Sequence, residues 1–205
     1  IRDVLGSRGL GDVYKRQKSK SGYIILVEGN IDVVSLHQAG FDSAVASLGT
    51  SLTPEQARLI SRFKQEVVIA YDADEAGKKA AQRAIGILEK LELKVRVLTV
   101  RGAKDPDEFI KAKGPEAFQN LLAESENHVE YRLDAVRAKH DLATDEGKVA
   151  YLKEAAGVIA QLPDRAAREV YAMRAASQCG VSPEAVQDEV RQQRRRRAAA
   201  ARRQT

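Results

Sequence analysis

Short apolar runs alternate with stretches of helical periodicity over the first half of the chain. The runs are nearly continuous and rich in Val, Ile and Leu, and they lie at residues 23–28, 43–48, 66–71 and 94–100. Helical spacing of apolar positions follows the first three runs, over residues 31–39, 53–64 and 76–91. Strands that are apolar throughout are typical of a parallel sheet covered on both faces. The pattern therefore predicts a three-layer α/β domain with a four-stranded parallel sheet and flanking helices.

Residues that start and stop helices lie at the expected boundaries. The segment Thr53-Pro54-Glu55-Gln56 has a hydroxyl at the N-cap, proline at the first helical position and glutamine at the third, which is a capping box. Gly40 follows the first helical stretch in the place of a C-terminal glycine. These signals support the predicted helix boundaries independently of the hydrophobic pattern.

The second half of the chain shows no further strand pattern after about residue 115. Helical stretches cover residues 115–140, 145–162, 164–179 and 183–197, with Thr144 and Ser182 as candidate N-caps. We expect an α/β domain at 18–114, an all-α helical bundle at 115–190 and a basic linker or tail at 191–205. Residues 1–17 have three glycines and no periodicity, so we treat them as a non-native or disordered leader. The chain lacks an initiator methionine, and we expect it to be truncated at its front.

Composition narrows the class of protein. The single cysteine, Cys179, excludes a disulfide framework and a cysteine-rich zinc site within these residues. No apolar stretch approaches the length of a membrane span and no signal peptide opens the chain, so we expect a cytoplasmic protein with no membrane partner. The net charge is +5, but residues 191–205 carry seven arginines and no acid, which leaves about −2 for residues 1–190. The basic character therefore belongs to the tail, which either attracts polyanions or is a solvated linker.

Carboxylates follow three of the four predicted strands. They are Glu28 after the first, Asp72 and Asp74 after the third, and Asp105 and Asp107 after the fourth. Because the carboxyl ends of parallel strands meet at one edge of the sheet, we expect these acids to converge there. The second strand brings the glycine turn Gly49-Thr50 to the same edge, and Lys104 lies in the fourth loop, where it can reach phosphates.

Such a cluster needs cations, since two carboxylates about 4 Å apart repel by roughly 4 kcal/mol at an effective dielectric near 20. Oxygen ligands without histidine or cysteine favour Mg²⁺ or Mn²⁺, one or two ions, over zinc. Phosphoryl-transfer chemistry uses such sites. Acids after strands also cap the next helix, and Asp32 and Glu75 fit that simpler interpretation. A lone D-x-D is common, but the three acidic motifs together are specific.

The motifs E-G-N-I-D, D-A-D-E-A-G and K-D-P-D-E resemble those of the Toprim domain, which primases, topoisomerases and some nucleases share. The resemblance implies that Glu28 is the catalytic acid or base and a metal ligand. It also implies that Asp72 and Asp74 bind the metal. Asp105 and Asp107 would complete the site, around a second ion or as outer ligands.

Within Toprim proteins, residues 20–120 are similar to bacterial replicative primases of the DnaG type. The similarity rests on V-E-G-N-I-D-V-V-S-L-H-Q-A-G-F, A-S-L-G-T-S-L-T-P-E-Q-A-R-L, V-V-I-A-Y-D-A-D-E-A-G and K-D-P-D-E-F-I. It implies an enzyme, a nucleotidyltransferase, that makes short RNA primers on single-stranded DNA from ribonucleoside triphosphates. It also implies that Gly49 and Thr50 lie beside the active edge. The helicase would bind through a missing C-terminal module, zinc would be held by a missing N-terminal module, and the protein is expected to be a monomer.

One residue departs from the family pattern, and several alternatives stay open. Asn30 stands where an aromatic residue is more usual, and we expect it to cap the following helix. Without the upstream modules, the fragment alone is expected to be inactive. The alternatives are another Toprim enzyme, such as a small nuclease or phage primase-helicase, and a non-catalytic nucleic-acid-binding Toprim module. A receiver-like signalling domain disagrees with the layout of the acids.

Overall fold

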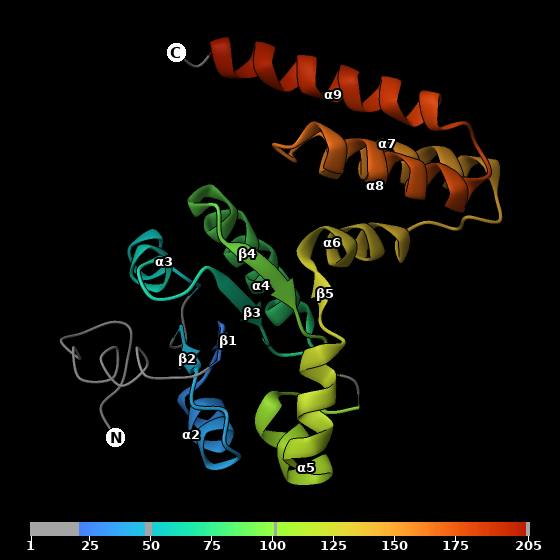
Figure 1. Ribbon diagram of the computed structural model, residues 1–205. Helices are drawn as coiled ribbons and strands as arrows, with labels where there is room; N and C mark the ends of the chain where they lie inside the picture. The colour runs from blue at the N-terminus through green and yellow to red at the C-terminus, as the bar shows by residue number, and fades with distance from the viewer. Residues whose placement is uncertain (1–20, 48–50, 101, 204–205) are drawn as a thin grey trace. The chain divides into compact units, whose positions relative to one another are not determined.

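The computed structural model describes residues 21–47, 51–100 and 102–203 (Figure 1). The chain folds as two compact units, Ile1–His128 and Val129–Thr205. The sequence pattern had placed this boundary at residue 114. It falls later because the helix and short strand that follow residue 105 pack against elements of the first unit. The expected leader at 1–17 lies outside the described residues.

The first unit is built on a five-stranded mixed sheet of order β2-β1-β3-β4-β5. The strands are β1 (Tyr23–Val27), β2 (Ala44–Ala46), β3 (Glu66–Ile69), β4 (Lys94–Val97) and β5 (Glu126–Asn127). The first four are parallel, as predicted, with Leu26 of β1 level with both Val45 of β2 and Ile69 of β3. The expectation of four strands was wrong by one, because β5 adds antiparallel to β4 at the edge. A strand of two residues is too short to show a period of two in the sequence.

Helices cover both faces of this sheet. On one face, α2 (Asn30–Gln38) and α5 (Pro106–Ala123) contact each other over an apolar core that includes Ile25, Val68 and Phe118. The other pair is α3 (Pro54–Ser61) and α4 (Glu75–Leu88), which contact each other, and α4 also contacts β4. The alternate strand residues Ile24, Leu26, Val67 and Ile69 are also buried. Burial of successive strand residues confirms the three-layer prediction.

The predicted caps can be checked against individual hydrogen bonds. Thr53 Oγ1 accepts from Gln56 N–H, and Thr53 N–H donates to Gln56 Oε1, so the capping box is confirmed. Gly40 has φ of +94°, a conformation that side-chain-bearing residues rarely adopt. The expectation that Asn30 caps the first helix was wrong. Gly29 is the N-cap, and the Asp32 carboxylate accepts the Gly29 N–H instead.

Arg96 of β4 anchors the segment that carries β5. Its Nε donates to Glu66 Oε1 at 2.7 Å, and its Nη1 donates both to the Leu122 carbonyl at 2.9 Å and to Ser125 Oγ. The side chain is largely buried and its guanidinium lies over the Tyr23 ring. One planar side chain thus connects β3, β4 and the end of α5.

The second unit is wholly helical in the residues described. It contains α6 (His128–Arg137), α7 (Asp145–Ile159), α8 (Arg165–Cys179) and α9 (Pro183–Arg203), around a core with Tyr151, Ile159 and Ala172 at its centre. The N-caps Thr144 and Ser182 are confirmed by bonds from Gly147 N–H and Ala185 N–H. The helix predicted over residues 183–197 is confirmed, and the expected linker or tail at 191–205 continues this helix up to Arg203. No helix in the described part of the chain is long and apolar enough to cross a membrane.

Candidate metal centre

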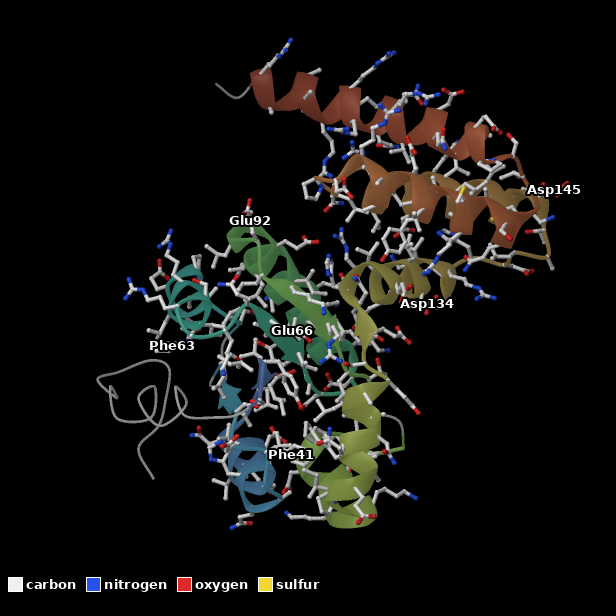
Figure 2. All side chains as sticks on the ribbon, viewed as in Figure 1. Phe41, Phe63, Glu66, Glu92, Asp134 and Asp145 are labelled. Carbon is white, nitrogen blue, oxygen red and sulfur yellow. The ribbon has the colours of Figure 1, made fainter. Side chains whose placement is uncertain are left out.

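The three strands that precede the predicted acids are neighbours in the sheet. β1, β3 and β4 are adjacent and parallel, so their carboxyl ends meet at one edge. Glu28 directly follows β1, Asp72 and Asp74 follow β3, and Asp105 lies in the loop between β4 and α5. We call these four residues the acidic rim. Figure 2 labels Glu66 at the start of β3, which marks the opposite edge of the sheet.

Backbone hydrogen bonds tie the three loops of the rim together. The N–H of Asp72 donates to Glu28 Oε1 at 3.3 Å, which joins the ends of β3 and β1. The N–H of Ala73, at the middle of the D-x-D motif, donates to the Lys104 carbonyl at 2.9 Å, which joins the ends of β3 and β4. Residues far apart in the sequence are therefore held at fixed mutual positions by the main chain.

Two of the rim carboxylates, Glu28 and Asp72, have a raised pKa. Partial burial raises the pKa of Glu28, and the charges of Asp72 and Asp74 raise it further. Partial burial also raises the pKa of Asp72, with a further increase from Asp105 that the Lys104 ammonium opposes. Both shifts follow from partial burial and from the closeness of the carboxylates that the bonds between these loops produce.

Two rim residues also cap helices. Asp74 Oδ1 accepts from Gly77 N–H at 2.7 Å at the start of α4, and Asp105 Oδ1 accepts from Glu108 N–H at 2.8 Å at the start of α5. The capping role that the sequence allowed for acids after strands is therefore present at the rim itself. Each of these bonds uses one carboxylate oxygen, so the second oxygen remains available to a ligand.

Asp107, the fifth predicted acid, is engaged away from the rim. Its carboxylate accepts from Lys111 Nζ at 2.7 Å and from the Ser35 hydroxyl, and these two bonds lower its pKa. Its backbone N–H donates to Asp32 Oδ1 at 3.2 Å. The structure thus brings four of the five predicted acids together, and it connects Asp107 to them through Asp32.

Asp32 has a larger part in the site than the sequence suggested. It does cap α2, but only 6% of it is exposed and it bridges the Gly29 N–H and the Asp107 N–H. Burial raises its pKa to about 6, and the charges of Asp105 and Asp72 contribute in the same direction. The signal that could have revealed it is the spacing of Asp32 four residues after Glu28, at the first turn of a helix that begins at the rim.

Gly77 is a second position that sequence reasoning missed. A Cβ at this residue would lie 2.2 Å from the Asp72 carbonyl oxygen and 3.0 Å from Glu28 Oε1. Only glycine lets the first turn of α4 approach the rim this closely. The signal was the glycine at the end of D-A-D-E-A-G.

The predicted residues Gly49 and Thr50 lie outside the described residues, whereas Lys104 is exposed beside the rim.

The donor chemistry of the rim fits a hard divalent cation. All its side-chain donors are carboxylate oxygens, the ligands that Mg²⁺ and Mn²⁺ prefer. Within the described residues, no three side chains of His, Cys, Asp or Glu are grouped so that they could hold one ion. Mg²⁺ is usually held by one or two carboxylates, with waters and phosphate oxygens completing its octahedron. The rim therefore suits a cation that is shared with a phosphate-bearing substrate.

The fold and the acidic rim define a Toprim-type domain, and a family model described as Toprim-like matches residues 25–110. A DNA primase of Clostridium acetobutylicum is 37% identical over 165 residues, which are 80% of this chain and 28% of that protein. A DNA primase domain from Pseudomonas aeruginosa has a TM-score of 0.72 and 30% identity, over 88% of this chain and 58% of that one. A DnaG primase catalytic domain solved with single-stranded DNA has a TM-score of 0.70 and 28% identity, over 86% and 56%.

The chain belongs to the bacterial DNA primases of the DnaG type. It spans only 28% of the length of its C. acetobutylicum relative.

A second family model, described as the DnaB-helicase binding domain of primase, matches residues 129–184. The sequence analysis expected a helicase-binding module beyond the chain, whereas this match lies within it. The match to the P. aeruginosa domain covers more residues than the whole first unit contains, so it also extends into the helices. The helical unit is thus shared with solved primase domains.

Proposed function

We propose that this chain is the metal-binding catalytic part of a DNA primase, which joins ribonucleotides into a short RNA primer on a single-stranded DNA template. The observation that carries the proposal is the convergence of Glu28, Asp72 and Asp74 at one sheet edge, where Asp72 N–H donates to Glu28 Oε1 and where partial burial and neighbouring carboxylates raise the pKa of Glu28 and of Asp72. Such a cluster is stable in its charged form when divalent cations lie between the carboxylates.

Glu28, Asp72 and Asp74 would hold one or two Mg²⁺ or Mn²⁺ ions together with phosphate oxygens of the substrate, since no three of these side chains are grouped to hold one ion alone. Asp105 would lie around the second ion or act as an outer ligand, and Asp107 would act only as an outer group through Asp32. When bound, the cation acts as a Lewis acid that acidifies the primer 3′-hydroxyl and neutralises charge on the triphosphate. The rim itself contributes by keeping its three loops, and so its carboxylates, in fixed positions. The bonds from Asp72 N–H to Glu28 and from Ala73 N–H to Lys104 hold its loops in register.

Other residues of the edge would handle protons and phosphates. Glu28, at the end of β1, would also be the acid or base that receives the proton of the 3′-hydroxyl. The exposed ammonium of Lys104 is close enough to lower the pKa of Asp72, and it can pair with a triphosphate oxygen. Gly49 and Thr50 would contribute from the loop after β2.

The proposed activity implies partners and a setting. A single-stranded template has a parallel in the related DnaG catalytic domain that was solved with single-stranded DNA. Ribonucleoside triphosphates would be the substrates, and zinc would be confined to a module upstream of this chain. We expect a monomer that works in the cytoplasm at the replication fork.

The test is a chimera, because the chain is short relative to its relatives. The matching 28% of the C. acetobutylicum primase would be replaced by this chain, and primer synthesis on single-stranded DNA would be measured with Mg²⁺ and ribonucleotides. We expect synthesis in the chimera and at least a hundredfold loss in Asp72→Ala and Asp74→Ala, because removing a metal ligand removes several kcal/mol of transition-state stabilisation. The exposed control Glu116→Gln should keep full activity. Unchanged synthesis in both aspartate variants would remove these residues from the mechanism.

The helical unit supports a second proposal, that residues 129–184 contact the replicative helicase. The family-model match to a helicase-binding domain of primase carries it. The test is titration of a labelled chain with the DnaB-type helicase, compared with a chain truncated after His128. Saturable binding that requires residues 129–184 supports the contact. Equal binding by the truncated chain contradicts it.

A further inference from the structure

The end of α9 is a highly charged surface that the proposed catalysis does not use. The first third of α9 packs against α7 and α8 through Val186 and Val190, which are almost fully buried. Beyond Val190, every residue up to Arg202 is exposed except the half-buried Gln193. Figure 1 shows α9 as one long helix, and Figure 2 shows nitrogen-tipped side chains projecting from it. We call residues 191–203 the arginine rod; it is about 20 Å long at 1.5 Å per residue.

Charge is segregated along this helix. The acids Glu184, Asp188 and Glu189 all lie in its packed third, whereas the rod contains seven arginines and no acid. Those arginines are Arg191, Arg194, Arg195, Arg196, Arg197, Arg202 and Arg203. The helix dipole favours cations at a C-terminus, but its effect is limited to about the last turn. The rod is several turns long, so the dipole accounts for only part of this charge.

The arginines of the rod repel one another with little internal compensation. Arg191 pairs with Asp188, and Arg196 faces the Gln192 amide. Within the described part of the chain, Arg194, Arg195 and Arg197 have no carboxylate partner. Arg194 lies three residues from both Arg191 and Arg197, a spacing at which like charges destabilise a helix. A polyanion bound along the rod would relieve this repulsion.

The arginine side chains project from the rod in several directions, and this arrangement favours one kind of polyanion over others. Successive helical residues are rotated by about 100°, so Arg194–Arg197 together span roughly 300° of the circumference. A rigid acidic surface, whether of a protein or of a duplex, can neutralise only the side that faces it. A flexible strand can wind around the rod and approach all of its faces.

The remaining residues of the rod are glutamine and alanine. The rod has no aromatic side chains of the kind on which proteins that bind single strands usually stack bases, and it has no large apolar side chains for the buried centre of a protein interface. Phosphate contacts made by arginine alone are independent of base sequence.

We propose that the arginine rod is a binding site for the phosphodiester backbone of single-stranded DNA, separate from the acidic rim and without base specificity. The choice of single-stranded DNA over other flexible polyanions rests on the proposed primase function. The rod would retain template near the enzyme through electrostatic contacts that exchange readily, a property useful to a protein that must bind many sequences.

The experiment measures binding of the full 205-residue chain to a fluorescent oligodeoxythymidylate by anisotropy at several salt concentrations. The variant Arg194→Gln/Arg195→Gln/Arg196→Gln/Arg197→Gln keeps helix propensity, since Gln and Arg are similar helix formers. We expect roughly a tenfold or greater loss of affinity near 0.1 M salt. The slope of log K against log salt should become less steep by about 3, because each phosphate contact contributes about 0.7 for a single strand.

Two control variants test whether binding depends on the position of the positive charges, on the net charge of the chain or on arginine itself. The quadruple lysine variant at the same positions should bind like the wild type. The variant Arg58→Gln/Arg62→Gln/Lys90→Gln/Arg165→Gln removes four scattered exposed cations and should have a much smaller effect. Unchanged binding by the rod glutamine variant, or an equal loss in the scattered variant, overturns the proposal. Tighter binding of a duplex of equal length, or equal competition by polyglutamate, overturns the assignment to single-stranded DNA.

Failure of this inference can be told apart from failure of the proposed function. Asp72→Asn/Asp74→Asn removes rim charge and should leave rod binding intact. Loss of primer synthesis in the chimera with normal DNA binding contradicts only the catalytic proposal. Normal primer synthesis with no contribution of the rod to binding contradicts only the inference about α9.

Discussion

The acidic rim depends on the absence of a Cβ at Gly77. The main chain of α4 passes so close to Asp72 that a methyl group would overlap the Asp72 carbonyl, at 2.2 Å. We expect Gly77→Ala to displace the D-x-D loop, to lower the free energy of unfolding by about 1–3 kcal/mol and to weaken divalent-cation binding at least tenfold. Urea unfolding and Mn²⁺ calorimetry measure the two effects.

Gly86 supplies the matched control in the same helix. Nothing lies within 4 Å of a Cβ at this position, so Gly86→Ala should raise the free energy of unfolding by about 0.5–1 kcal/mol and leave cation binding unchanged. If both alanine variants behave alike, the close approach at Gly77 has no role in the rim.

Asp32 makes stability depend on pH. Its pKa rises from 3.8 to about 6 on folding, because burial and the neighbouring Asp105 and Asp72 disfavour the charged form. Since the folded pKa lies above the unfolded one, its contribution to stability is fully present below about pH 4 and is lost as pH rises through about 6. Without divalent cations, the difference in unfolding free energy between wild type and Asp32→Asn should fall by roughly 3 kcal/mol over that range. A difference that stays constant between pH 4 and 7 would contradict the raised pKa.

Strand β4 carries two cations, Arg96 and Lys94, that pair with the carboxylate of Glu66; Arg96 is largely buried and Lys94 is exposed. Both pair with Glu66, but Lys94 is 68% exposed, whereas Arg96 is 21% exposed and also binds the Leu122 carbonyl. We expect Arg96→Lys to cost about 1–3 kcal/mol, because lysine cannot reach Glu66 and the end of α5 together. Lys94→Gln should cost less than about 1 kcal/mol in the same urea unfolding assay. Equal costs would show that the connection from Arg96 to the end of α5 contributes nothing.

The elements that could be predicted from sequence are those whose own residues determine them. The four parallel strands bury nearly every residue, and α3 has a complete capping box, so each is visible in a short window of sequence. The short strand β5 could not be predicted in this way, because its two residues pair with β4 only after α5 has brought them there. The helix predicted over residues 183–197 continues to Arg203 in α9, and the part beyond residue 197 was missed, since this stretch shows no apolar periodicity although arginine and alanine both favour helix.

The same distinction applies to the candidate site. The convergence of Glu28, Asp72, Asp74 and Asp105 follows from strand order alone, so the sequence pattern was enough to predict it. The separate bonding of Asp107 to Lys111, and the bridge from Asp32 to Asp107, depend on how α2 packs against α5. Such contacts between elements are set by packing in three dimensions, and no local sequence pattern records them.

For the molecule as a whole, charge is divided between the two units. The acidic rim belongs to the first unit, and the arginine rod of α9 belongs to the second. The net charge of +5 therefore describes neither surface, and a prediction from net charge alone would miss the acidic site.

We infer that the rim carboxylates are stable together because divalent cations lie between them. Calorimetric titration of the full chain with Mn²⁺ tests it most directly, with the variant Glu28→Gln/Asp72→Asn/Asp74→Asn and the exposed control Glu55→Gln/Glu92→Gln/Glu116→Gln. We expect saturable binding to the wild type and the control and none to the rim variant. Without cations, the rim variant should be more stable than the wild type. Equal Mn²⁺ binding by the rim variant and the wild type would contradict this inference.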